Sequence, residues 1–175
     1  MSNDSAAMAL DFATNWLPLA KTPSELVPKK RGIKKDILDM NKWLHQNVNR
    51  KVYQIGFAKN QSDYDAASEV LFDALDSLNA RLAKNQYLHG QSITLSDLFL
   101  LPTLVRFEAV YEVHFKANRK PLKAFEHLYQ YMLDFMAMPV FRETVDIDYM
   151  KRHYYRSHHH INPMGIVPSG PEIVW

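Results

Sequence analysis

Apolar residues recur at helical spacing along most of the chain. From residue 33 to 48 they follow at steps of four, three, four and four, at Ile33, Ile37, Met40, Leu44 and Val48. A second stripe begins at residue 66 and contains Ala66, Val70, Ala74, Leu78 and Leu82. This spacing is typical of one face of an amphipathic helix. Because no segment shows sustained alternation with period two, we expect an all-α fold.

Capping residues and prolines mark the expected helix starts. Ser62 and Asp65 have the spacing of a capping box, so we expect a helix to begin there. Pro121 and Pro139 each suit the first turn of a helix. Asp146 is placed to cap the helix expected over the residues that follow it. The sequence therefore predicts several short helices in its second half.

The sharpest local signal is the segment GQSITLSDL at residues 90–98. We expect Thr94 and Asp97 to form a capping box in which each side chain bonds the other residue's backbone N–H. The helix that follows is nearly all apolar as far as Tyr111, so it should be buried in the centre of the fold. Pro102 lies inside this helix and should kink it, because proline removes a backbone hydrogen bond.

These patterns divide the chain into four parts. Residues 1–17 contain a first helix, and residues 18–31 form a connector with three prolines. Residues 32–156 carry the periodic pattern of a helical bundle. Residues 157–175 contain three prolines and two glycines, which predict an extended C-terminal tail.

Composition excludes several classes of function. The 21 Lys and Arg residues nearly balance the 19 Asp and Glu, so we expect no nucleic-acid partner. The five glycines form no phosphate-binding loop, and the absence of cysteine excludes a cysteine nucleophile among these 175 residues. The longest apolar run, residues 98–105, is far shorter than a membrane span, so we expect no membrane partner. Without a charged N-terminal signal region, the cytoplasm is the expected compartment.

Three groups of residues are candidate sites. Tyr53, Tyr111 and Tyr154 carry phenols that can exchange protons or stabilise a thiolate, although amphipathic core-edge residues are the favoured interpretation. His158-His159-His160 suggests metal ligands, but consecutive side chains point in different directions, so we expect a solvated loop and no metal. The basic cluster at residues 29–35 is followed by acidic residues and is interpreted as a solvated helix start.

Several segments together resemble one family. The capping box at residues 90–98 resembles that of the C-terminal domain of glutathione transferases. Three longer strings resemble the glutathionyl-hydroquinone reductases, also called Xi-class or omega-like glutathione transferases. They are KVYQIGFA at residues 51–58, RFEAVYEVHFK at 106–116, and KRHYY with INPMGIVP between 151 and 168. The resemblance implies a glutathione S-transferase C-terminal-like helical bundle.

The resemblance also implies an activity and a site. In that family a thioredoxin-like domain holds glutathione and a nucleophilic cysteine, while the helical domain binds an aromatic hydroquinone. Tyr53 matches a tyrosine assigned as a proton donor and acceptor, and Tyr111 and Tyr154 match tyrosines thought to lower the cysteine pKa. Asp4 and Ser5 resemble the acidic-Ser pair that holds the γ-glutamyl part of glutathione, so residues 1–17 would include the end of the thioredoxin-like domain.

Two function classes stay open at this point. In the first, the chain is the substrate-binding half of a reductase, inactive alone and dependent on a thioredoxin-like domain supplied in trans. In the second, it is a non-catalytic binding or scaffold module with a transferase-like fold. A homodimer is compatible with either class.

Overall fold

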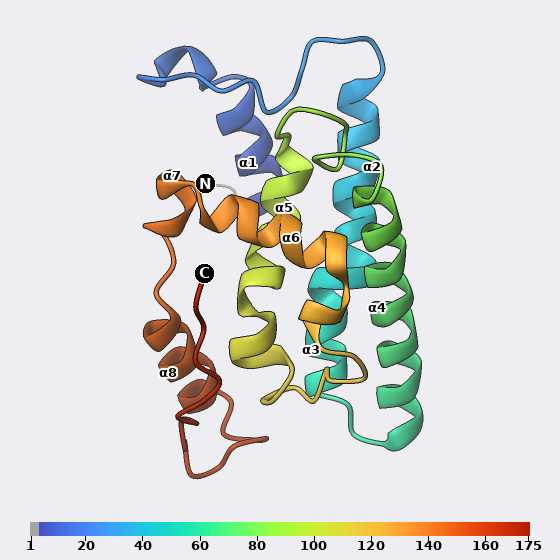
Figure 1. The fold of residues 1–175 in the computed structure, drawn as a ribbon, viewed down its shortest axis with the longest axis vertical. Helices are drawn as coiled ribbons and strands as arrows, with labels where there is room; N and C mark the ends of the chain where they lie inside the picture. The colour runs from blue at the N-terminus through green and yellow to red at the C-terminus, as the bar shows by residue number, and fades with distance from the viewer. Residues whose placement is uncertain (1–3) are drawn as a thin grey trace.

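The computed structural model describes residues 4–175, and within this range every regular element is helical (Figure 1). The all-α prediction is therefore confirmed. The α-helices are α1 (Ser5–Ala13), α2 (Ile33–Leu44), α3 (Arg50–Gly56), α4 (Gln61–Leu82), α5 (Leu95–Arg106), α6 (Glu126–Met136), α7 (Pro139–Arg142) and α8 (Ile147–Ser157). Two π-helical segments, η2 (His45–Asn49) and η3 (Phe107–Tyr111), and two short 3-10 turns, Leu17–Leu19 and Leu122–Ala124, complete the helical elements.

The predicted stripe over residues 33–48 lies on one continuous helical rod made of α2, η2 and α3. Ile37, Leu44 and Val48 on this rod are fully buried, because it packs against both α5 and α4. In Figure 1 the long α4 runs alongside α2 and α3, while α6 crosses the front of the bundle. The core lies where these helices meet α5, which was the expected central helix.

The start of α5 is fixed by one buried carboxylate. One oxygen of Asp97 accepts hydrogen bonds from the Thr94 backbone N–H at 2.7 Å and the Thr94 hydroxyl at 2.8 Å. Its other oxygen accepts from the Leu88 N–H at 2.9 Å and the Tyr131 hydroxyl at 2.8 Å. The predicted capping box is present, and Asp97 also joins the loop before α5 to α6.

The expected start and buried face of α4 were partly wrong. Asn60, not Ser62, caps the helix, and its side-chain oxygen accepts from the Asp63 N–H at 2.8 Å. Ala66 and Val70 are exposed, because the buried face at this end of α4 passes through Ala67 instead. The stripe read from spacing alone was therefore offset from the true face in the first turns.

The starts of the last three helices were predicted with mixed success. A 3-10 turn, Leu122–Ala124, follows Pro121, so α6 begins at Glu126, five residues later than expected. Pro139 opens α7, and the Asp146 carboxylate accepts from the Tyr149 N–H at the start of α8, as predicted.

The C-terminal tail contains no regular helix and returns along α8 (Figure 1). Lys151 on α8 is buried beneath it and donates hydrogen bonds to the backbone carbonyls of Ser169 at 3.2 Å and Gly170 at 3.1 Å. The Asn162 amide donates to the Tyr155 carbonyl at 2.7 Å. The expected extended tail is therefore a strap held against the last helix.

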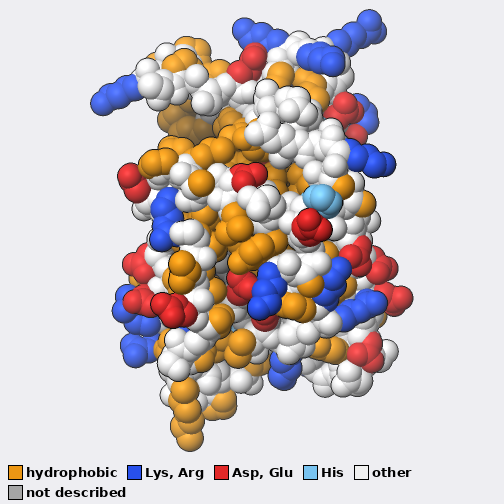
Figure 2. Space-filling view, in the orientation of Figure 1, with side chains coloured by type: hydrophobic (Ala, Val, Ile, Leu, Met, Phe, Trp, Pro, Cys, Tyr) orange, Lys and Arg blue, Asp and Glu red, His pale blue; other side chains and the backbone are white. Residues whose placement is uncertain are grey.

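The surface is apolar around the N-terminal segment. Figure 2 shows hydrophobic side chains gathered over the upper part of the molecule, where α1 and the residues after it lie. Phe12, Trp16 and Leu19 are all more than half exposed there. None of the described helices combines the length and apolar character needed to cross a membrane.

Candidate functional site

The hydroxyl groups of Tyr53, Tyr111 and Tyr154 meet at one point. The Tyr53 and Tyr154 oxygens are 2.7 Å apart, and the Tyr111 and Tyr154 oxygens are 3.1 Å apart. Tyr154 is therefore the central member of a hydrogen-bonded chain of three phenols, which we call the tyrosine triad. The three hydroxyls therefore converge although the residues lie far apart in the sequence, whereas their catalytic role stays a prediction.

Each triad member is followed four residues later by a second ring. The pairs are Tyr53–Phe57, Tyr111–Phe115 and Tyr154–His158, with ring centroids 6.0, 5.5 and 5.6 Å apart. Residues four apart lie on the same side of a helix, so each element presents a two-ring face. The second rings were not predicted as members of this cluster, although their shared spacing from the tyrosines is visible in the sequence.

The second rings close around the triad. Phe115 is fully buried, with its ring centroid 5.3 Å from that of Tyr53 and 6.1 Å from that of Tyr154. Phe57 lies at the edge of this cluster, and its side chain is partly exposed. Its ring centroid is 5.2 Å from that of Phe115 and 5.2 Å from that of His158. These separations are favourable for aromatic pairs. The result is an aromatic cluster with a buried floor and an exposed rim.

A glycine makes this close packing possible. Gly56, at the end of α3, lies directly against the Phe115 ring, and a methyl group in place of its hydrogen would overlap that ring. The absence of a side chain at residue 56 therefore sets how closely Phe115 approaches α3. Because Tyr53 lies on the same short helix and contacts the same ring, Gly56 also positions the triad.

The hydroxyls of the triad are hydrogen-bond donors, and burial disfavours ionisation of two of them, Tyr53 and Tyr111. Burial, with the Tyr154 hydrogen bond as a second cause, raises the pKa of Tyr53 to about 12. Burial also raises the pKa of Tyr111 far above its usual range, and the neighbouring phenols contribute to the shift. Three phenol O–H groups carry three protons, and the two hydrogen bonds within the triad use two of them. One O–H is therefore left to donate to a bound anion or a ligand oxygen.

The histidine segment is more structured than expected. Its first member, His158, is half-buried, and its Nδ1 lies 3.0 Å from the Nε2 of His114. The interpretation of all three residues as a solvated loop was therefore wrong for His158, because the segment folds back onto the chain near residue 114. His159 and His160 are exposed. Among the described residues no group of His, Asp and Glu is arranged to hold a metal ion.

Asp4 and Ser5 lie at the start of α1. One Asp4 oxygen accepts hydrogen bonds from the N–H groups of Ala6 and Ala7, both at 3.0 Å, and Ser5 is the first residue of the helix. Both side chains are exposed. Whether they contact glutathione stays a prediction.

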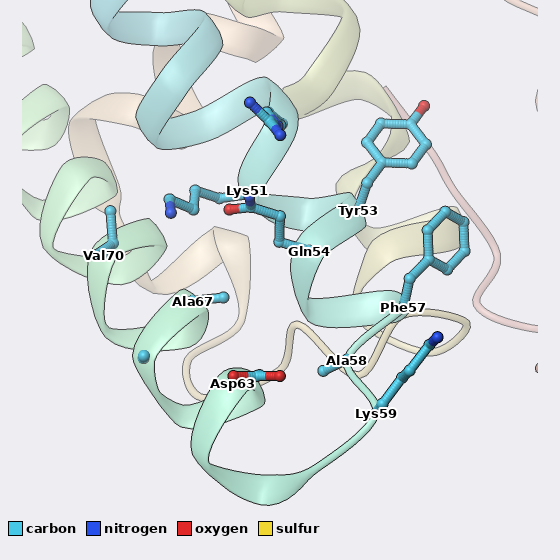
Figure 3. Close-up of a pocket in the computed structure, with 11 residues that line it drawn as sticks. Lys51, Tyr53, Gln54, Phe57, Ala58, Lys59, Asp63, Ala67 and Val70 are labelled. Carbon is cyan, nitrogen blue, oxygen red and sulfur yellow. The ribbon is translucent and has the colours of Figure 1, made fainter.

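Other features lie apart from the triad hydroxyls. A groove of about 700 Å³ separates α3 from α4, with Lys51, Gln54 and Ala67 in its walls. In Figure 3 the Lys51 and Gln54 side chains reach toward this groove, whereas the Tyr53 hydroxyl points away from it.

The basic cluster at residues 29–35 is solvated as expected, since all its Lys and Arg residues are exposed. Lys35 forms an exposed ion pair with Asp39 at 2.6 Å.

Comparison with known proteins shows which family this helical fold resembles. Residues 61–134 match the family model described as glutathione S-transferase, C-terminal domain. The chain has the helical fold of a glutathione S-transferase C-terminal domain. Its all-α fold and its likeness to solved transferase structures agree with this match.

Two of the relatives are named glutathionyl-hydroquinone reductases. The chain is 37% identical over 171 residues to glutathionyl-hydroquinone reductase YqjG of Escherichia coli, covering 98% of this chain and 52% of that protein. It is 32% identical over 171 residues to glutathionyl-hydroquinone reductase PcpF of Sphingobium chlorophenolicum, covering 54% of it. The chain thus spans about half the length of these curated relatives.

Solved structures similar to this chain belong to the same kind of protein as its sequence relatives. The glutathione-bound structure of YqjG superposes with a TM-score of 0.92 at 36% identity, covering 99% of this chain and 56% of that one. Glutathione transferase Xi 1 from Trametes versicolor superposes with a TM-score of 0.90 at 33% identity. The match covers 97% of this chain and 59% of that one. The transferase domain therefore resembles the helical part of Xi-class enzymes.

Proposed function

We propose that this transferase domain supplies the aromatic-substrate half of a glutathionyl-hydroquinone reductase. The observation that supports the proposal most is the tyrosine triad, whose hydroxyls meet at 2.7 and 3.1 Å although they come from three separate elements. Core-edge tyrosines with only structural roles would have no reason to converge. The surrounding aromatic rings offer stacking surfaces for a hydroquinone.

The proposed reaction needs a thiol from outside these 175 residues, which contain no cysteine. A thiolate in a thioredoxin-like domain would attack the glutathione sulfur of a glutathionyl-hydroquinone. The carbon–sulfur bond breaks, its electron pair and a proton go to the ring carbon, and hydroquinone leaves. The resulting mixed disulfide is then reduced by a second glutathione, which leaves as glutathione disulfide. The relatives named as reductases support this assignment.

The triad has two roles in this scheme. Its one uncommitted O–H donates to the thiolate, which favours the ionised form and lowers the thiol pKa. A neutral phenol with a pKa of about 12, such as Tyr53, also serves as the proton donor to the leaving hydroquinone at neutral pH. Both roles require the thiol to lie within hydrogen-bond reach of the triad, directly or through one water.

The N-terminal residues have a part in the same proposal. Residues 1–17 would lead from the thioredoxin-like domain into the bundle, with residues 18–31 as connector, 32–156 as the substrate-pocket bundle and 157–175 as its strap. Asp4 and Ser5 would contact the γ-glutamyl part of glutathione. Support comes from the carboxylate of Asp4, which two backbone N–H groups orient at the start of α1. The proposal assigns the protein to the cytoplasm, and a homodimer stays a prediction that a solution molar mass would test.

The test is hydroquinone release from a glutathionyl-hydroquinone in the presence of glutathione. The 175-residue chain alone should match the blank, and adding a thioredoxin-like domain with a Cys-Pro motif should give release that depends on both parts. Tyr53→Phe or Tyr154→Phe should reduce this release by about 10²-fold or more, the usual contribution of acid–base catalysis. Tyr149→Phe changes an exposed tyrosine on the same helix as Tyr154 and should leave release unchanged. Release by the chain alone, or equal release without it, would contradict the proposal.

A further inference from the structure

The central tyrosine of the triad lies on a helix at the edge of the bundle. Tyr154 belongs to α8, and the C-terminal tail runs back along this helix (Figure 1). Among the described helical elements α8 packs chiefly against η3, which contains Tyr111. The tail is the other segment to which α8 is hydrogen-bonded. The position of Tyr154 therefore depends on η3 and on the tail.

A buried lysine joins α8 to the tail. Lys151 is 5% exposed, and its ammonium donates hydrogen bonds to the carbonyls of Ser169 at 3.2 Å and Gly170 at 3.1 Å. In the described part of the chain Lys151 forms no ion pair. Hydrogen bonds from an ionised donor are stronger than those between neutral groups, and lysine is rarely buried without partners. The two carbonyls therefore hold the ammonium, and the ammonium holds the tail.

The tail is attached on both sides of this contact. Before it, the Asn162 amide donates to the Tyr155 carbonyl at 2.7 Å and to the Ile166 carbonyl at 2.9 Å. After it, Ile173 and Trp175 pack against the hydrophobic core. A groove of about 750 Å³ lies between the tail and the start of α8, with Lys151 in its wall, so close packing does not join the two segments there. Lys151 thus links α8 to a segment that is itself fixed to the core.

The link lies one helical turn from the triad. Lys151 and Tyr154 are three residues apart, which makes them neighbours on the surface of α8. The Tyr154 hydroxyl must reach two partners at once, Tyr53 at 2.7 Å and Tyr111 at 3.1 Å. A hydroxyl pair separated by more than about 3.5 Å is no longer hydrogen-bonded, so a movement of α8 by about 1 Å breaks the triad.

We propose that Lys151 is a positioning residue that fixes α8 to the C-terminal tail and thereby holds the Tyr154 hydroxyl between those of Tyr53 and Tyr111. It acts through Tyr154 and touches neither the thiol nor the aromatic ligand. Its effect on the triad is a property of the chain alone. Its effect on the reaction rests on the proposed function.

The first test measures the triad without any reaction. Lys151→Met keeps the length of the side chain and removes the ammonium. The Tyr154 hydrogen bond is one cause of the raised pKa of Tyr53, about 12, so Lys151→Met should lower this pKa toward that in Tyr154→Phe. NMR of ring-labelled tyrosine would measure it in the folded chain. Arg152→Met removes an exposed cation from the same helix and should leave the Tyr53 pKa unchanged.

A second variant breaks the same contact from the tail. A chain that ends at Pro168 loses both acceptor carbonyls and should also lower the Tyr53 pKa. This variant decides the matter if Lys151→Met does not fold. A role in stability alone would lower Tm and leave the Tyr53 pKa of the folded variants unchanged. An unchanged pKa in either folded variant overturns the inference.

The reaction gives an independent readout. With a thioredoxin-like domain added, Lys151→Met should reduce hydroquinone release by no more than Tyr154→Phe does. Adding Lys151→Met to Tyr154→Phe should cause no further loss, because the lysine acts through that hydroxyl. Losses that multiply would overturn the inference. If the wild type releases no hydroquinone, the proposed function fails, whereas the Tyr53 pKa still decides whether Lys151 positions the triad.

Discussion

Tyr53 and Tyr154 are 101 residues apart in sequence, yet their hydroxyl oxygens lie 2.7 Å apart. The first comes from the end of the α2–η2–α3 rod and the second from the last helix of the domain. A hydrogen bond between elements so distant in the chain needs the whole bundle to hold its geometry. The site is therefore a property of the tertiary fold, not of any local motif.

Removing the central hydroxyl should alter the titration of its neighbour. We expect Tyr154→Phe to lower the pKa of Tyr53 from about 12, because the Tyr154 hydrogen bond is one cause of the shift. Burial is the larger cause and stays, so the pKa should remain above the ordinary value of about 10. NMR of ring-labelled tyrosine would follow this pKa. Tyr149→Phe, at an exposed position on α8, should leave it unchanged; an equal effect of both variants would argue against the hydrogen-bonded triad.

Much of the fold follows from local patterns. Helical spacing predicted the α2–η2–α3 rod, and the Thr94–Asp97 spacing predicted the start of α5, because both depend on residues near each other in sequence. The buried face in the first turns of α4 was predicted wrongly. Ala66 and Ala67 have identical side chains, so only tertiary packing decides which one is buried.

The candidate site was predictable only in part. The three tyrosines were candidates from the chemistry of phenols and from the resemblance, but their convergence depends on the tertiary fold and follows from no local pattern. The partner of His158 was not predictable, because His114 lies 44 residues away and no spacing rule connects them. The rings at Phe57, Phe115 and His158 carried a usable signal, since each follows a triad tyrosine by four residues.

Loss of the Asp97 carboxylate should destabilise the whole domain. Asp97→Ala leaves the buried Leu88 N–H and Tyr131 hydroxyl, as well as the Thr94 cap, without their acceptor. We expect a cost of about 3 kcal/mol or more, which lowers Tm by roughly 6–12 °C for a domain of this size. Asp63→Ala, in the exposed first turn of α4, is the control and should cost about 1 kcal/mol or less. Thermal unfolding followed by circular dichroism would measure both, and equal losses would disprove the special role of Asp97.

A methyl group at Gly56 should disturb the aromatic cluster. Gly56→Ala forces the Phe115 ring to move, because the new carbon would overlap it. Overpacking of this kind costs about 1–3 kcal/mol, and the chemical shifts of Tyr53 should change with it. Gly170→Ala adds the same methyl group where no atom lies within 4 Å. An unchanged unfolding free energy in Gly56→Ala would contradict the close packing of α3 on Phe115.

Stability should fall at mildly acidic pH because of His114. Its pKa is lowered to about 4 in the folded chain, mainly by burial and then by His158, against about 6.5 when unfolded. The unfolded chain therefore binds a proton first as pH falls, so stability present above pH 6.5 is lost toward pH 4. His114→Phe should flatten this dependence, measured as urea unfolding free energy between pH 7 and 4. His159→Phe should not; a variant that keeps the wild-type slope would show that His114 is not its source.

The most direct test of the account is to map where an aromatic hydroquinone binds. Hydroquinone would be titrated into an isotope-labelled chain while the side-chain NMR signals are followed. The account predicts saturable shifts at Tyr53, Tyr111, Tyr154 and His158, with residues on the far side of α3 unaffected. Shifts confined to Gln54, Ala67 and Val70, which line the groove between α3 and α4, would place the ligand elsewhere and contradict the assignment of the tyrosine triad as the substrate site.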